Sequence, residues 1–92
     1  MDRWEKGMLA KSLAGHDKEK IYVIISIEEN HIFLVDGVAR TLDRPKKKKK
    51  KHVQLIRQKH PIENVDDAGI KCILSEYKKT EKTEKTESRE ES

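Results

Sequence analysis

Residues 21–35 read Ile-Tyr-Val-Ile-Ile-Ser-Ile-Glu-Glu-Asn-His-Ile-Phe-Leu-Val, and this stretch decides the fold class. Its two ends are rich in β-branched and aromatic residues, which are typical of strands. In the first seven residues, alternation places the odd-numbered side chains on one face and the even-numbered ones on the other. The polar Glu28-Glu29-Asn30 segment between the two apolar runs predicts a turn. Residues 21–35 are therefore expected to form a β-hairpin.

Shorter strand signals lie on both sides of this hairpin. Residues 7–12 predict a first strand, residues 38–42 a short strand after the Asp36-Gly37 turn, and residues 52–56 a last strand. Five strands in about 50 residues, joined by tight turns, favour a small barrel, because closure removes exposed sheet edges. The expected fold class is therefore mainly β.

A helix is expected after the strands. Ile70, Ile73, Leu74 and Tyr77 follow an i, i+3, i+4, i+7 spacing, which predicts one apolar helical face over residues 66–77. Either Asn64 or Asp66 is suited to cap its start. The apolar face is expected to pack on the strands, because a helix this short is marginal alone. A helix that binds a partner is the alternative.

The last residues repeat Thr-Glu-Lys and contain no apolar side chain to bury. We expect a disordered charged tail over 80–92, with a polar helix held by Glu–Lys pairs as the alternative. The chain is thus expected to have three parts: a β domain over 1–60 that includes the basic segment 46–51, a linker with a short C-terminal helix over 61–79, and the tail.

The charge of this 92-residue chain is concentrated in one place. Its formal net charge is +4, yet residues 46–60 alone contain eight basic and no acidic residues. The rest of the chain sums to −4, because it holds 13 of the 21 basic residues and all 17 acidic ones. Lys46–Lys51 is an unbroken run of six lysines.

Such a run favours a polyanionic partner. Phosphates relieve the repulsion among the ammonium groups, and each contact releases counterions. A solvated linker or a localisation patch is the alternative. A membrane surface is not expected as a partner, because no amphipathic apolar face accompanies the lysines. With only four aromatic residues, the chain favours structured RNA read by backbone and shape over single strands read by base stacking.

Several functional classes find no support in the sequence. No Gly-rich phosphate loop or nucleophile elbow is present, and the four histidines do not pair with cysteine at zinc-site spacing. We therefore expect no enzyme, no catalytic residues, no metal and no cofactor. No apolar run approaches the ~20 residues of a membrane helix. The single Cys72 suits a reducing, cytoplasmic location.

Residues 7–24 resemble a KOW motif, and the resemblance continues through Val35-Asp36-Gly37 and Arg40 to residues 44–53. The pattern is similar to the ribosomal protein L14e/L6e/L27e family, in particular to its small bacterial KOW-containing RNA-binding members. It covers about residues 6–57. Glu19 stands where the wider motif commonly has glycine, and Tyr22 where it commonly has a small residue.

The resemblance implies an SH3-like five-stranded barrel that binds ribosomal RNA, or sometimes protein, through the loop after the first strand. In that loop it implies a backbone turn at Gly15, with Asp17 bracing the loop. Together with the charge pattern, it gives this set of expected RNA-binding residues: Lys11, Gly15, His16, Lys18, Lys20, Arg40, Arg44, Lys46, Lys47, Lys48, Lys49, Lys50, Lys51, His52 and Arg57.

The expected function is thus a cytoplasmic, non-catalytic RNA-binding protein of the translation machinery. Its expected partner is structured ribosomal RNA, with ribosomal proteins as further partners, and it is expected to be a monomer when free. The alternative is an SH3-like protein-interaction module of the translation or transcription machinery.

Overall fold

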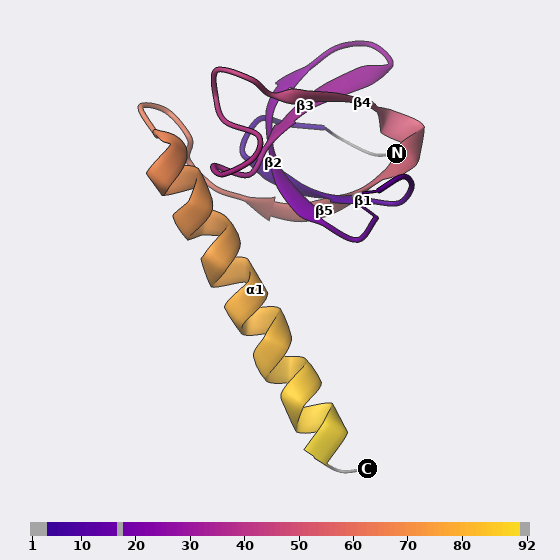
Figure 1. The fold of residues 1–92 in the computed structure, drawn as a ribbon, viewed down its shortest axis with the longest axis vertical. Helices are drawn as coiled ribbons and strands as arrows, with labels where there is room; N and C mark the ends of the chain where they lie inside the picture. The colour runs from indigo at the N-terminus through magenta and orange to yellow at the C-terminus, as the bar shows by residue number, and fades with distance from the viewer. Residues whose placement is uncertain (1–3, 17, 91–92) are drawn as a thin grey trace.

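The computed structural model describes residues 4–16 and 18–90, and the side chains within this part up to residue 79. Its elements are, in chain order, β1 (Met8–Ser12), β2 (Ile21–Ile27), β3 (His31–Val35), β4 (Lys46–Lys49), the 3-10 helix η1 (Lys50–His52), β5 (Val53–Lys59) and α1 (Asp67–Glu90) (Figure 1). The predicted hairpin is confirmed, since β2 and β3 pair in antiparallel fashion.

The five strands form one antiparallel sheet in the order β4-β3-β2-β1-β5. The two edge strands, β4 and β5, are consecutive in the chain and are joined by the three residues of η1. The sheet therefore rolls so that its two edges approach each other at that end (Figure 1). In the described part of the chain the edges do not pair with each other, so the sheet is not closed and the barrel stays a prediction.

Both faces of the sheet are buried. One apolar cluster contains Leu9, Val23 and Val35 together with Ile70 and Leu74 of α1. The other lies on the concave face and contains residues of four strands: Ala10, Tyr22, Ile24, Ile32, Leu34 and Val53. Side chains of β2 enter the two clusters alternately, which explains why this strand is an almost unbroken apolar run.

A β-bulge in β2 corrects the predicted alternation. Ile24 pairs with Leu34 and Ser26 with Phe33, so Ile25 is an additional residue without a partner in the ladder. A bulge of this kind moves later side chains to the opposite face. Ile27 accordingly packs against the concave-face cluster, whereas simple alternation placed it with Ile21.

The fourth strand is not where the sequence pattern placed it. Residues 38–42 were expected to form a strand, but they lie in the loop between β3 and β4. The strand is formed instead by Lys46–Lys49, which pairs with β3. The Asp36 carboxylate accepts hydrogen bonds from the Val38 and Arg40 amides, so the backbone after β3 turns instead of extending.

Helix α1 packs on the sheet through the predicted face. Ile70 and Leu74 are buried in the first cluster, with Ile73 and Tyr77 partly buried beside them. Asp66 caps the helix, because its carboxylate accepts a hydrogen bond from the Gly69 amide at 2.9 Å. Of the two candidate caps, Asp66 is therefore the one used.

Helix α1 is longer than the short helix that was expected. Its bounds are Asp67–Glu90, against the expected 66–77. Extending a helix that packing has already nucleated adds one hydrogen bond per residue fixed. Figure 1 shows this part of α1 running away from the strands. Residues 91–92 of the predicted tail lie outside the described residues.

The loop after β3 contacts the first turn of α1 closely. Gly37 has a φ of +80°, and a Cβ atom there would lie 2.4 Å from the Asp67 carbonyl oxygen. The Asp67 carboxylate also accepts a hydrogen bond from the Leu42 amide at 2.8 Å. The sequence signal at Asp36-Gly37 is confirmed as a turn, and the structure adds that glycine is required for the helix to approach.

Gly37→Ala should therefore lower the free energy of unfolding by about 2 kcal/mol or more, from left-handed strain and the clash with α1 together. Urea denaturation followed by circular dichroism measures the change. Val38→Ala is the control, because the Val38 side chain is 65% exposed and its loss should cost less than about 0.5 kcal/mol. An equal loss of stability in Gly37→Ala and Val38→Ala would contradict the close contact between Gly37 and α1.

Glu19 offers a second test of backbone strain. Its φ is +73°, a conformation that costs an L-residue about 1–2 kcal/mol. Glu19→Gly should raise the free energy of unfolding by about 0.5–1 kcal/mol, after the greater flexibility of glycine in the unfolded chain is subtracted. Leu13→Gly, in the same loop and at a described residue without a positive φ, should lower stability in the same urea titration. A loss of stability in Glu19→Gly would refute the strain argument.

Candidate nucleic-acid interface

Three separate segments of the chain meet around one groove with a volume of about 510 Å³. The segments are the β1–β2 loop (residues 13–20) together with the start of β2, the β3–β4 loop (residues 36–45) and β4. The residues that line the groove are Gly15, His16, Lys20, Tyr22, Ala39, Arg40, Lys46 and Lys48. Four of them carry a full positive charge, and none is acidic. We call this site the first groove.

The pairing of β4 with β3 determines which lysines reach the first groove. Lys46 pairs with Leu34 and Lys48 with Ile32, and both partners belong to the concave-face cluster. Directly paired residues point to the same side of a sheet. The stems of Lys46 and Lys48 thus extend over apolar side chains, and both residues are half-buried.

The β1–β2 loop is tied to β4 by a lysine. The Lys48 ammonium group donates a hydrogen bond to the Ala14 carbonyl at 3.0 Å, and the buried Ser12 hydroxyl donates to the same carbonyl at 3.1 Å. Gly15 follows with a φ of +89° and reverses the backbone, as the sequence predicted. These contacts place the loop next to β4. Asp17, predicted to brace this loop, lies outside the described residues.

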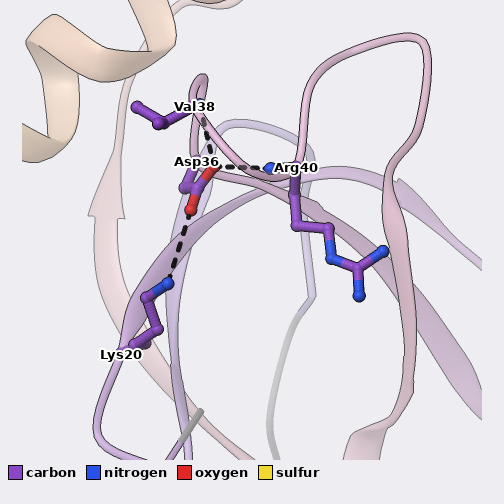
Figure 2. Close-up of polar contacts among 4 residues, drawn as sticks. All are labelled: Lys20, Asp36, Val38 and Arg40. Atoms are coloured by element: carbon purple, nitrogen blue, oxygen red, sulfur yellow. Dashed lines mark hydrogen bonds and ion pairs between the residues drawn. The ribbon is translucent and has the colours of Figure 1, made fainter.

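Asp36 organises the other loop of the first groove (Figure 2). Its carboxylate accepts hydrogen bonds from the Val38 amide at 2.9 Å and the Arg40 amide at 2.8 Å. The Lys20 ammonium group lies 3.8 Å from the other carboxylate oxygen. Figure 2 shows the Arg40 side chain extending away from this carboxylate. Asp36 therefore positions two of the four cations. It holds the Lys20 ammonium group directly and Arg40 through its backbone amide, and the Arg40 guanidinium extends away from the Asp36 carboxylate.

The pKa of Asp36 lies below its ordinary value. Partial burial raises the pKa, but hydrogen bonds from the Arg40 and Val38 amides and the charge of Lys20 lower it by more. The carboxylate is consequently ionised at neutral pH, and its charge stabilises the folded chain.

The remaining lysines of the run lie elsewhere. Lys47 pairs with Phe33 on the opposite face of β4, with its ammonium group 5.7 Å from the Phe33 ring centre and 3.5 Å from the Glu28 carboxylate. Lys49, Lys50 and Lys51 line a second depression with Asn30 and His31, about 390 Å³ in volume. The lysine run is therefore divided between two surfaces.

Other predicted site residues do not line the first groove. Lys11 is half-buried in β1, Lys18 and Arg44 are exposed in loop or turn positions, and His52 is exposed at the end of η1. Arg57 lies in β5, the edge strand opposite β4 in the hydrogen-bond order. Of the fifteen residues expected to bind RNA, the structure brings six together in the first groove: Gly15, His16, Lys20, Arg40, Lys46 and Lys48.

Sequence reasoning missed four lining residues: Tyr22 and Ala39 in the first groove, and Asn30 and His31 in the second depression. Tyr22 carried a usable signal, because it follows Lys20 at a spacing of two, which places both on one side of an extended chain. Ala39, Asn30 and His31 enter through loop geometry and strand pairing, which residue type alone does not indicate.

The described residues contain no group of three or more His, Cys, Asp or Glu placed to hold a metal ion. No helix in the described part of the chain is long and apolar enough to cross a membrane. No protein-family model matches the chain, and no curated protein matches it significantly in sequence.

The lowered pKa of Asp36 predicts a specific pH dependence of stability. Because the folded-state pKa lies below the unfolded value of about 3.9, the stabilisation is fully present above that value. It is lost as the pH falls through the folded-state pKa. Asp36→Asn keeps a carbonyl oxygen but removes the charge, so it should be less stable than the wild type at neutral pH.

The stability difference between wild type and Asp36→Asn should shrink below about pH 4. Urea titrations at a series of pH values measure it. Asp43→Asn provides the control, because Asp43 is an exposed carboxylate in the same β3–β4 loop. A difference that stays constant down to acid pH would show that the Asp36 charge does not stabilise the fold.

Proposed function

We propose that this protein is a cytoplasmic, non-catalytic RNA-binding protein that holds the phosphate backbone of structured RNA in the first groove. Ribosomal RNA is the proposed target class. The observation that carries the proposal is the convergence of Lys20, Arg40, Lys46 and Lys48 from separate segments on one concave surface. Such a surface attracts phosphates through charge and hydrogen bonds and supplies little base discrimination.

The backbone of the β1–β2 loop supports the resemblance to KOW proteins. Glu19 stands where the motif commonly has glycine, and its φ of +73° is a conformation that glycine adopts without strain. The loop thus has the backbone shape that glycine favours although the residue is different. We further propose that the rolled sheet is an SH3-like barrel, since η1 joins its two edge strands through only three residues.

The alternative, a protein-interaction module, has less support. The apolar face of α1 was its most plausible docking surface. In the structure Ile70 and Leu74 of that face are buried in the first cluster, and Tyr77 packs beside them. No observation in the described part of the chain favours a protein partner over RNA.

A matched pair of variants tests the proposal. Lys46→Ser/Lys48→Ser removes two charges from the first groove. Lys6→Ser/Lys59→Ser removes the same charge from a depression that also contains Glu5 and Glu63. Thermal unfolding of each variant checks the fold, because Lys48 contacts Ala14 and Lys59 contacts Glu5.

The measurement is the affinity for a short, fluorescently labelled ribosomal RNA hairpin at several potassium chloride concentrations. Each lost phosphate contact should reduce the salt slope by about 0.7–0.9, so Lys46→Ser/Lys48→Ser should reduce it by about 1.4–1.8. Its affinity should fall about tenfold or more near 0.1 M salt. Lys6→Ser/Lys59→Ser should keep the wild-type slope. Absent or salt-independent binding by the wild type would refute the proposal.

A further inference from the structure

We propose that Asn30, His31, Lys49, Lys50 and Lys51 form a second phosphate-binding site, so that one chain holds two RNA segments at once. This inference rests on the proposed function and extends it. The first groove and this second site share no lining residue. They use different parts of the same lysine run.

Strand geometry separates the two sites. Lys48 pairs with Ile32 and faces the concave side, whereas Lys49 pairs with His31 and faces the opposite side. Successive side chains of a strand point to opposite faces, so the backbone of β4 lies between these two ammonium groups. A phosphate bound by Lys46 and Lys48 is therefore not the phosphate that Lys49 reaches.

The second site has a defined shape because two turns are tied together. The Lys50 amide donates a hydrogen bond to the Asn30 carbonyl at 3.0 Å, which connects η1 to the turn between β2 and β3. The Lys50 ammonium group lies 5.7 Å from the centre of the Trp4 ring. Both contacts restrict η1, so the lysines at this site are displayed from a fixed backbone.

The composition of the second site suits RNA. Its lining contains three lysines and no acidic residue, so its local charge is unopposed within the depression. Lysine only donates hydrogen bonds, but the amide of Asn30 both donates and accepts, and the imidazole of His31 adds two ring nitrogens that can form hydrogen bonds. These two side chains suit ribose hydroxyls and exposed base edges beside the bound phosphates.

A charge-matched set of variants isolates this site. Lys49→Ser/Lys51→Ser removes two charges and leaves Lys50 on Trp4. Lys46→Ser/Lys48→Ser and Lys6→Ser/Lys59→Ser remove the same charge from the first groove and from the control depression. Native mass spectrometry with a short RNA hairpin in excess counts the RNA molecules bound per chain.

Two hairpins should bind per chain in the wild type and in Lys6→Ser/Lys59→Ser. One should bind in each of the other two variants, and none or little when all four of those lysines are replaced. Bead-bound hairpin should also capture a second, labelled hairpin through the wild type but not through Lys49→Ser/Lys51→Ser. Light scattering of the free protein excludes capture through protein dimers.

Three results would overturn the inference. A wild type that binds one hairpin would refute the second site while leaving the first groove intact. Complete loss of binding in Lys46→Ser/Lys48→Ser would show that the second site does not act independently. A wild type that binds no RNA would refute the proposed function together with this inference.

Discussion

The register of β4 on β3 is the constraint on which the candidate site depends. Lys46 and Lys48 oppose Leu34 and Ile32, so their stems cover the concave-face core and their charges reach the first groove. A slip of one residue would exchange the faces of all four lysines in the strand. A homopolymer cannot specify its own register, because every shift presents the same side chains. The register must therefore be set by contacts at the two ends of β4: by the Asp36 turn before it, and by the hydrogen bond from the Lys50 amide of η1 to the Asn30 carbonyl after it.

The central hairpin supplies the rigid frame for both loops of the first groove. β2 is buried on both faces, by α1 on one side and by the concave cluster on the other. The groove residues Lys20 and Tyr22 lie at its start, and Asp36 follows directly after β3. The pairing of β2 with β3 thus brings Lys20 close to the Asp36 carboxylate. The β3–β4 loop is also connected to α1, by the hydrogen bond from the Leu42 amide to the Asp67 carboxylate and by the close approach of Gly37 to the first turn of the helix.

Sequence reasoning succeeded where side-chain pattern determines structure and failed where pattern is absent or overruled. The hairpin, the apolar helix face and the turn at Asp36-Gly37 were all predicted from alternation, spacing and glycine. β4 was missed because six identical lysines carry no periodicity and lysine is a poor strand former. The segment 38–42 was predicted as a strand, but the Asp36 carboxylate accepts hydrogen bonds from the Val38 and Arg40 amides and turns the backbone there. At the site, the charge pattern of the sequence was enough to predict the lysines as a group. Only the strand pairing shows that Lys48 lines the first groove while Lys49 lines the second depression.

An edge strand is a favourable place for a lysine run on electrostatic grounds. In an extended strand, neighbouring ammonium groups point to opposite faces, and those on one face are separated by two residues, or about 6.6 Å along the backbone. That spacing approaches the Debye length of about 8 Å at physiological salt, so their repulsion is partly screened. Lysines on an edge also oppose unwanted pairing with another sheet. The extended conformation of β4 thus reduces the repulsion among its lysines and also presents their charges on both faces of the strand. The Glu28 carboxylate next to Lys47 offsets part of this positive charge.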